Sequence, residues 1–363
     1  MVSFRRVVLF GSGTLGREVA QKLRRAGVEP LAFVDETPAK RGTTIDGLQV
    51  FALDEGVERF GGDASFLVTI WKPAHRYAAT RSKLHGAGAR QVASFLHAAY
   101  AFPDQFLPHY GFDRPEVTAA QQSEIDRAAA LFADDRSRDE LERHLRFRRQ
   151  LDFDALPPTS PETYFRREFP ETLAADTFVD CGAFNGDTLA AFVALTRGTF
   201  GEAIALEPHP EHFRALQASL AAFDGDVRRR VRLVNAAVGE RSGTSRFHQV
   251  AGEGSFLSES GTELVETVAL DDVLQGTSGR LFIKFDVEGA EQAALRGAAA
   301  TIRNRTPALA VSAYHRVDDL WRIPLLIQDL NPSYRLYLRT EGEDGMGIVC
   351  YAAVEAEAPA GAR

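Results

Sequence analysis

The stretch FVDCGAFNGDT, residues 178–188, decides the fold that this sequence predicts. A short apolar run carries Asp180 near its end, a turn with two glycines follows, and Asp187 stands where a helix begins. Negative charge at these two positions would repel a pyrophosphate, whereas it would attract the ammonium and sulfonium groups of S-adenosylmethionine. The stretch is therefore unlike a dinucleotide fingerprint and favours S-adenosylmethionine as the cofactor.

Two further strand ends offer side chains to the same ligand. Glu207-Pro208 follows an apolar run at residues 203–206, where a carboxylate can accept hydrogen bonds from ribose hydroxyls. Asn235-Ala236 follows the next run and is small and polar, as an adenine edge would require. The expected cofactor-binding residues are Asp180, Gly182, Ala183, Asn185, Gly186, Asp187, Thr188, Glu207, Pro208, Asn235, Ala236 and Asp286.

From residue 177 onward, short apolar runs alternate with stretches of helical spacing. Strand and helix in turn predict a parallel sheet with helices on both faces. The expected strands are residues 178–181, 203–206, 231–234, 281–285, 308–312, 334–338 and 348–352. Residues 244–250 and 263–268 are expected to form an inserted pair of strands.

The beginning of the chain shows the same alternation, with expected strands at residues 7–10, 31–34 and 66–70. The run GSGTLG at residues 11–16 fits G-x-G-x-x-G between a strand and a helix, and Asp35 ends the next strand. Such glycines let backbone N–H groups approach a phosphate, while the acid accepts hydrogen bonds from ribose hydroxyls. The alternative is a tight turn without a ligand. This second nucleotide site would consist of Gly11, Ser12, Gly13, Thr14, Gly16 and Asp35.

Between these two parts the strand pattern stops, and residues 121–132 and 136–150 carry charged and apolar residues at helical spacing. We therefore expect an α/β protein with two doubly wound parallel-sheet domains joined by a helical connector. The expected limits are residues 1–105 for the first domain, 106–170 for the connector and 171–363 for the second, seven-stranded domain.

The candidates for catalytic residues lie in the run from Lys284 to Glu288 and at the later His315. Side chains alternate along a strand, so Lys284 and Asp286 share a face, and the buried lysine needs a partner. We expect Asp286, Glu288 and His315 to be catalytic, with a neutral His315 accepting a proton near its ordinary pKa of about 6.5. Structural roles, with Lys284 paired to a carboxylate and Glu288 capping a helix, are the alternative. We expect no metal, although Asp286, Glu288 and His315 could instead hold a divalent cation.

At this point the second half of the chain resembles the FkbM family of methyltransferases. The resemblance rests on these motifs: Asp180-Cys181-Gly182-Ala183, Gly186-Asp187-Thr188, Glu207-Pro208, Asn235-Ala236-Ala237-Val238-Gly239, Gly254-Ser255-Phe256-Leu257-Ser258, Leu270-Asp271-Asp272-Val273-Leu274, Lys284-Phe285-Asp286-Val287-Glu288-Gly289-Ala290-Glu291 and Tyr314-His315. It implies a class I methyltransferase fold, S-adenosylmethionine as donor and O-methylation of a sugar, glycan or secondary metabolite. Asn185 departs from the acid that relatives often carry.

Three segments have weaker interpretations. Tyr164, Phe165, Arg166 and Arg167 could cover the cofactor and anchor an acidic acceptor, and residues 254–258 could form a lid that excludes water. Solvated arginines are the alternative for the first of these. Residues 33–50 resemble the small nucleotide-binding domain of sugar acyltransferases, which implies no particular chemistry.

Composition restricts the partners. The 363 residues carry a net charge of -8, which lacks the basic excess of a nucleic-acid binder. No apolar stretch approaches the length of a membrane span, and Cys181 and Cys350 read as buried thiols rather than a disulfide. We expect a cytoplasmic protein that binds a small-molecule or carbohydrate acceptor, no nucleic acid and no membrane, and that could form a homo-oligomer.

Two other functions remain open from the sequence. An NAD-dependent oxidoreductase would use the G-x-G-x-x-G run and Asp35, which leaves the acids at positions 180, 207 and 286 unexplained. A non-catalytic nucleotide-sensing protein would use both folds for binding alone, since a fold does not fix a function.

Overall fold

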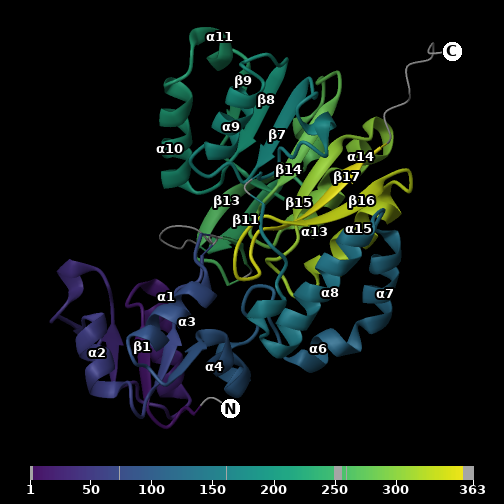
Figure 1. Cartoon of the computed structure of the whole chain (residues 1–363). Coiled ribbons are helices and arrows are strands. Elements are labelled where there is room, and N and C mark those ends of the chain that lie inside the picture. The colour runs from purple at the N-terminus through teal and green to yellow at the C-terminus, as the bar shows by residue number, and fades with distance from the viewer. Residues whose placement is uncertain (1–2, 73, 161, 249–255, 259, 355–363) are drawn as a thin grey trace. The chain divides into compact units, whose positions relative to one another are not determined.

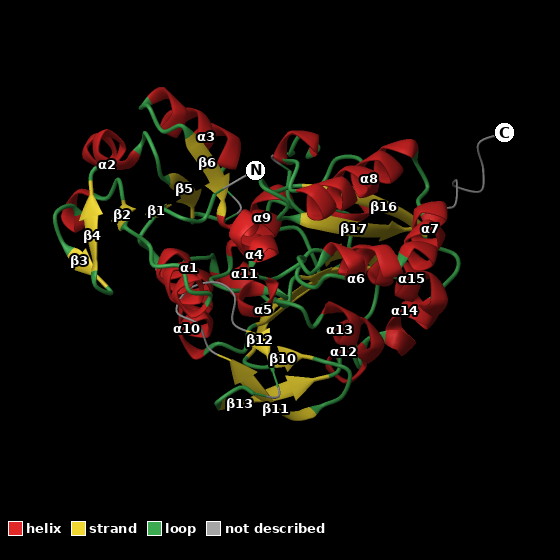
Figure 2. Ribbon diagram, turned by 90° about the horizontal axis from the view of Figure 1, so that it is seen from below, coloured by secondary structure: helices red, strands yellow, loops and turns green. Residues whose placement is uncertain are grey.

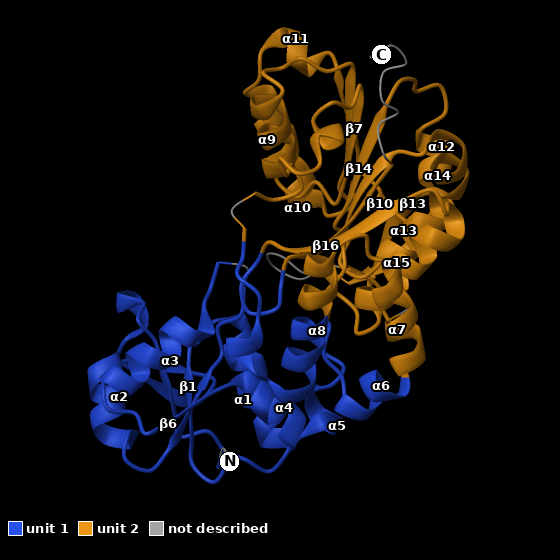
Figure 3. Ribbon diagram, turned by 45° about the vertical axis from the view of Figure 1, so that its right-hand side comes forward, with its two compact units in different colours: residues 1–120, 142–159, 342–346 blue, residues 121–141, 160–341, 347–363 orange. Residues whose placement is uncertain are grey.

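The computed structural model describes residues 3–72, 74–160, 162–248, 256–258 and 260–354 (Figure 1). The chain divides into two compact units, which are coloured separately in Figure 3. Unit 1 comprises Met1–Ala120, Glu142–Thr159 and Gly342–Met346, and unit 2 comprises Gln121–Leu141, Ser160–Glu341 and Gly347–Arg363. The units are therefore interleaved along the sequence. The domain limits expected after residues 105 and 170 stay predictions.

Unit 1 is built on a six-stranded sheet in the order β3-β4-β2-β1-β5-β6. Its strands are β1 Val7–Phe10, β2 Ala32–Val34, β3 Thr44–Ile45, β4 Leu48–Phe51, β5 Ser65–Val68 and β6 Gln91–Ser94. Neighbouring strands run parallel except β3, which pairs antiparallel with β4. The sequence predicts β1, β2 and β5 to within two residues but does not predict β4 and β6, whose runs are short and mix apolar with polar residues.

Helices cover both faces of this sheet. They are α1 Thr14–Arg25, α2 Leu53–Phe60, α3 Tyr77–Gly86, α4 Phe95–Ala101, α5 Pro103–Phe106, α6 Pro115–Ala120 and the later part of α8 Asp135–Gln150. Successive residues of β1 alternate between two hydrophobic cores: Val7 and Leu9 pack with α1, while Val8 and Phe10 pack with α2 and α3. All four side chains are buried, as in a parallel strand that is covered on both faces. The expected doubly wound fold is thus confirmed for unit 1.

Unit 2 is built on a seven-stranded sheet in the order β16-β17-β15-β14-β7-β8-β9. Its strands are β7 Thr177–Cys181, β8 Glu202–Leu206, β9 Val231–Val234, β14 Leu281–Phe285, β15 Ala308–Ser312, β16 Arg335–Thr340 and β17 Ile348–Ala353. All seven expected strands are present. The sheet is not wholly parallel, however, because β17 pairs antiparallel with both β15 and β16. Only residues 341–347 separate β16 from β17, too few for the crossover that a parallel pair needs.

The helices of unit 2 separate most of these strands along the sequence. They are α7 Gln122–Leu131, the start of α8, α9 Asp187–Leu195, α10 Pro210–Ala221, α11 Gly225–Arg228, α12 Leu270–Val273, α13 Glu291–Gly297, α14 Ala299–Arg305 and α15 Asp319–Leu330. A small sheet, β10-β13-β11-β12, consists of β10 Ala237–Val238, β11 Gly243–His248, β12 Phe256–Leu257 and β13 Glu263–Val268 (Figure 2). The antiparallel pair β11 and β13 confirms the expected insertion.

Three other expectations meet the structure here. Cys181 and Cys350 are free, buried thiols, as the sequence predicts. Among the described residues, none of the helices has the length and apolar character that a membrane crossing requires. Gly254 and Ser255 of the expected lid, together with residues 249–250 of the expected strand, lie outside the described residues.

Candidate active site

The carboxyl ends of β15, β14, β7 and β8 bring the main expected site residues to one edge of the unit 2 sheet. These strands are neighbours in the sheet and run parallel. Asp180 lies in β7, Glu207 follows β8, Asp286 follows β14, and His315 lies beyond the end of β15. This edge is where open α/β sheets hold their ligands.

Gly182 lets the ends of β7 and β14 approach each other. Its φ of 82° favours glycine, and an added Cβ would lie 1.9 Å from the carbonyl oxygen of Asp286. The Asp286 backbone N–H donates to the Cys181 carbonyl oxygen across 3.0 Å. Glycine is therefore required at position 182, because the two chain segments pack too closely for a side chain. This packing fixes the position of Asp286, at which the turn after β14 begins.

Lys284 is paired, and its partner is Asp180. The Lys284 Nζ donates to Asp180 Oδ1 across 2.9 Å and to the Gly182 carbonyl oxygen across 2.7 Å, and both side chains are buried. Burial alone would lower the pKa of Lys284, but Asp180 and Asp286 raise it, so the lysine is charged. One oxygen of Asp180 thus holds a structural ion pair. The other, Oδ2, is buried and has no hydrogen-bond partner among the described residues.

Glu207 is held in place by the backbone. Its Oε2 accepts from the Phe184 N–H across 2.9 Å, and its Oε1 accepts from the His209 N–H across 2.8 Å. Burial raises the pKa of Glu207 to about 7, against the opposing effect of these hydrogen bonds. The Phe184 and His209 rings both pack against His212, with centroids 4.4 and 4.1 Å from it. The carboxylate is therefore fixed beside an aromatic cluster.

The remaining expected cofactor residues surround these two anchors. The Asn235 side-chain amide donates to the Glu207 and Pro208 carbonyl oxygens, so it ties the end of β9 to the turn after β8. Asn185 and Asp187 are exposed or half-buried in the turn before α9 and accept hydrogen bonds from nearby backbone. Gly186, with φ of 88°, stands at the N-cap of α9. Ala183 and Ala236 are buried, and Thr188 lies in the first turn of α9.

Asp286 is oriented by Tyr164, a residue far upstream in the sequence. The Tyr164 hydroxyl donates to Asp286 Oδ2 across 2.9 Å, and Lys284 Nζ lies 5.3 Å from the centre of the Tyr164 ring. Burial would raise the pKa of Asp286, but Lys284 and His315, with hydrogen bonds from Ser312 and Tyr164, hold it below its usual value. Among the described residues, its Oδ1 has no hydrogen-bond partner.

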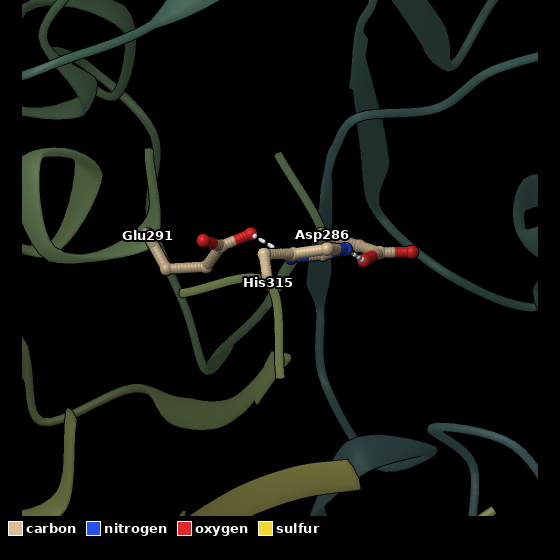
Figure 4. Close-up of side chains that lie close together, drawn as sticks. All are labelled: Asp286, Glu291 and His315. Carbon is tan, nitrogen blue, oxygen red and sulfur yellow. Dashed lines mark hydrogen bonds and ion pairs between the residues drawn. The ribbon is translucent and has the colours of Figure 1, made fainter. Parts of the chain in front are cut away.

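His315 lies between two carboxylates on opposite sides of its ring (Figure 4). Its Nδ1 is 2.8 Å from Glu291 Oε1, and its Nε2 is 3.5 Å from Asp286 Oδ1. Glu288 Oε2 lies 3.7 Å from the same Nε2. The Glu288 backbone has φ of 52°, in the left-handed region, and turns the chain directly after Asp286. The three expected catalytic residues are thus brought together, with Glu291 as a fourth member.

The expectation of a neutral His315 is wrong. Burial alone would lower the pKa of its imidazole, but Glu291, Glu288 and Asp286 together raise it to about 10. The ring is therefore an imidazolium at neutral pH and cannot accept a proton. The sequence alone gives no sign of this shift, because it does not show that the carboxylate of Glu291 is buried against the ring.

The same cluster contains the atoms that a metal would need. Asp286, Glu291 and His315 each offer a ligand atom within 4.8 Å of the others. Asp286 and Glu291 approach opposite ring nitrogens, however, so one ion could not contact all three with the ring in this orientation. A cation at Nε2 would have Asp286 and Glu288 as partners, with Glu291 orienting the ring from Nδ1.

The two arginines of the segment before β7 differ in burial and in role. Arg166 is buried and paired with Glu168 and Glu341, so it is not available to anchor an acceptor. Arg167 is exposed and paired with Glu162, as expected for a solvated arginine. Tyr164 matters more than either of them, through Asp286. Its position in the chain gives no sign of that contact, because 122 residues separate the two.

In unit 1 the expected nucleotide-site residues also come together. Asp35 Oδ2 accepts from the Ser12 N–H across 2.9 Å and from the Ser12 hydroxyl across 2.5 Å. Gly16 packs against Gly11, where an added Cβ would lie 2.0 Å from the Gly11 carbonyl oxygen. Gly13 and Thr14 are exposed at the start of α1.

A solved structure and a curated protein are similar to this chain over different lengths. A crystal structure of methyltransferase FkbM from Methylobacillus flagellatus KT is 24% identical, with a TM-score of 0.79, and the match covers 97% of this chain and 90% of that chain. This likeness shows a shared fold. The redox-sensing transcriptional repressor Rex of Roseiflexus sp. (strain RS-1) is 28% identical over 106 residues, which are 29% of this chain and 48% of that protein. The chain thus spans about half the length of this curated relative.

The family match falls on the segment that carries the site. Residues 180–342 match the family described as the methyltransferase FkbM domain. They begin at Asp180 and include Glu207, Asp286 and His315. The part of the chain that matches this family is therefore formed almost entirely by unit 2.

Proposed function

We propose that unit 2 transfers a methyl group from S-adenosylmethionine to a hydroxyl of a sugar, glycan or secondary metabolite. The observation that carries the proposal is Asp286, an ionised carboxylate held at the carboxyl end of β14 by Tyr164 and His315 with one oxygen left without a hydrogen bond. Such a group can accept a hydroxyl proton at the edge of the sheet where ligands bind.

The charge of this edge fits the proposed cofactor. Asp180 Oδ2 is a buried oxygen without a hydrogen-bond partner in the described part of the chain. An unpartnered carboxylate oxygen suits a ligand that carries an ammonium and a sulfonium group. When bound, S-adenosylmethionine supplies the electrophilic methyl group. Glu207 would hold its ribose hydroxyls, because the carboxylate is fixed by two backbone N–H groups and retains further acceptor capacity.

The proton of the acceptor goes to Asp286 rather than to His315. Oδ1 of Asp286 would accept the hydroxyl proton as the hydroxyl oxygen bonds to the methyl carbon and the carbon–sulfur bond of the donor breaks, with S-adenosylhomocysteine as the leaving group. The His315 imidazolium, 3.5 Å from that oxygen, stabilises the carboxylate before the transfer and holds it in position. Because the pKa of Asp286 is lowered, the carboxylate is a weak base, and positioning of the hydroxyl contributes most of the rate.

The test combines binding with turnover. Calorimetry should detect binding of S-adenosylmethionine and S-adenosylhomocysteine to the protein. A screen of sugars and glycans with labelled donor should reveal which acceptor takes up the methyl group. Asp286→Asn keeps the shape of the side chain, so binding should persist while turnover falls by about 10²- to 10⁴-fold. Asp226→Asn, on exposed α11, is the matched control and should change neither. Undiminished turnover in Asp286→Asn would remove Asp286 from the mechanism.

A further inference from the structure

Unit 1 contains a cavity of about 340 Å³ that methyl transfer in unit 2 does not explain. It lies beyond the carboxyl ends of β1, β2 and β5 and is lined by residues that follow each of them. β2 and β5 pair with opposite edges of β1, so the chain order reverses direction at this point of the sheet. Open α/β sheets bind ligands at such switch points. The volume lies at the lower end of the range of about 300–1,000 Å³ for small-molecule pockets, which suits a single nucleotide.

Asp35 forms one side of this cavity. Its Oδ2 accepts hydrogen bonds from Ser12, and its Oδ1 accepts from the Thr37 N–H across 2.9 Å. Burial would raise the pKa of Asp35, but the hydrogen bonds from Ser12 and Thr37 hold it well below its usual value. The carboxylate is therefore charged and fixed in orientation. A fixed carboxylate in a cavity wall is suited to accept hydrogen bonds from sugar hydroxyls.

The start of α1 forms the adjoining part of the wall, next to Ser12, and Gly13 there lacks a packing reason to be glycine. An added Cβ at Gly13 would find no heavy atom within 4 Å, in contrast to Gly11 and Gly16, where it would meet atoms at 2.9 and 2.0 Å. No described side chain caps α1, and its first turn holds no acid. The backbone is thus left bare at the point where the positive end of the helix dipole meets the cavity.

One of the few lysines of the chain lines this cavity, and a second is paired with Asp35. The sequence has only five lysines, Lys22, Lys40, Lys72, Lys83 and Lys284. Lys72 is exposed and lines the cavity, and Lys40 Nζ lies 3.2 Å from Asp35 Oδ2. Lys72 and the uncapped start of α1 suit the phosphates of a nucleotide, and the carboxylate of Asp35 suits its ribose hydroxyls.

We propose that this cavity binds a nucleoside diphosphate, alone or as part of a larger molecule, with its phosphates at the start of α1 and Lys72 and its ribose hydroxyls at Asp35. The shared chemistry is present in ADP, in UDP and in NADH. The site lies wholly in unit 1 and is separate from the carboxylates that serve methyl transfer.

The experiment uses the full chain with S-adenosylhomocysteine present in excess, so that a nucleotide cannot report on unit 2. ADP, UDP and NADH are each titrated by calorimetry, and at least one should bind with a stoichiometry of one. Gly13→Asp places a carboxylate at the helix start. It should weaken that binding at least tenfold through repulsion of phosphate, while the melting temperature stays equal or rises because aspartate is a good N-cap.

Gly62→Asp is the matched control. Gly62 also lies in unit 1, an added Cβ there would meet no heavy atom within 4 Å, and it does not line the cavity. It should leave nucleotide binding unchanged. Lys72→Met, at an exposed position, gives a second variant that should weaken binding about tenfold, as expected for loss of one charge-assisted contact.

The outcomes are distinct. Absence of binding by all three probes at millimolar concentration would overturn the proposal, as would unchanged affinity in Gly13→Asp. Equal weakening by Gly13→Asp and Gly62→Asp would assign the effect to net charge and would also overturn it. Failure of S-adenosylhomocysteine to bind would instead count against the methyl-transfer proposal and leave the nucleotide titrations interpretable.

Discussion

His315 donates a hydrogen bond from Nδ1 to Glu291 Oε1 across 2.8 Å, and both side chains are buried. This contact ties a residue after β15 to the first residue of α13. With Asp286 and Glu288 at the other ring nitrogen, it makes the histidine a positive charge among carboxylates rather than a titrating base.

His315 is expected to stay protonated throughout the neutral range. Its folded pKa of about 10 lies above the unfolded value of about 6.5. The stabilisation from its charge is therefore fully present below pH 6.5 and is lost as the pH rises through 10. Imidazole NMR signals should show no titration between pH 5 and 8. The free-energy difference between wild type and His315→Gln should shrink above pH 9, and a midpoint near 6.5 would contradict the assignment.

Glu291→Gln should change the pKa of His315 without altering a group that contacts the substrate. The amide keeps the shape of the side chain but removes the charge, so the pKa of His315 should fall. Binding of S-adenosylhomocysteine should persist, while turnover becomes dependent on pH in the range where His315 now titrates. Glu263→Gln, on exposed β13, is the control and should leave the pH profile flat. A lower rate with an unchanged profile would indicate a purely structural role.

Tyr164→Phe removes the hydroxyl that orients Asp286. Hydrogen bonds to charged groups contribute about 1.5–3 kcal/mol, so both stability and kcat should fall. Tyr334→Phe is a matched control, because its hydroxyl donates to the neutral Pro307 carbonyl oxygen. That variant should lose about 0.5–1.5 kcal/mol of stability in urea unfolding with kcat unchanged. Equal effects of the two variants on kcat would remove Tyr164 from the site.

Affinity for S-adenosylmethionine should rise with pH around neutrality. Burial raises the pKa of Glu207 to about 7, and the ionised form is the better acceptor of hydroxyl hydrogen bonds. Glu207→Gln should bind roughly 10- to 100-fold more weakly and without this pH dependence. Glu202→Gln, at the other end of β8, should behave as wild type. Calorimetric titrations between pH 6 and pH 8 measure this affinity. Unchanged affinity in Glu207→Gln would reject the assignment of Glu207 to the ribose hydroxyls.

Chelation should leave methyl transfer unchanged. His315 is held by carboxylates at both ring nitrogens, Glu291 at Nδ1 and Asp286 at Nε2, so we expect the cluster to work through these ion pairs. Turnover in the presence of excess EDTA should match that of untreated enzyme. If EDTA abolishes turnover and Mg²⁺ or Mn²⁺ restores it, Asp286, Glu288 and His315 are a metal site.

The need of Lys284 for a partner follows from the sequence, since a lysine inside a buried parallel strand cannot stand alone. The identity of that partner could not be predicted. Asp180 is 104 residues away and meets Lys284 through the register of β14 with β7, in which the two residues are directly paired. The charge of His315 was hidden for a related reason, because it depends on the burial of Glu291 rather than on its place in the motif.

The interleaving of the two units could not be predicted from the sequence either. Asp134 and Ser137 belong to unit 2 because they bind Arg339 of β16, 205 and 202 residues later in the chain. Local patterning predicts the helix that begins at Asp135 but says nothing about which sheet its first turn joins. Such long-range side-chain contacts leave no periodic signal.

That interleaving also sets the order in which the protein can be completed as the ribosome makes it. β17 is the last strand in the sequence, yet it lies between β15 and β16, so the sheet of unit 2 has a gap until residue 353 has emerged. Unit 1 also lacks some of its contacts until late in synthesis, because Asp344 accepts a hydrogen bond from the Tyr77 N–H and binds His75. The stretch from residue 335 to residue 353 therefore completes the sheet of unit 2 and also supplies late contacts to unit 1, whose own sheet is complete once β6 has been made.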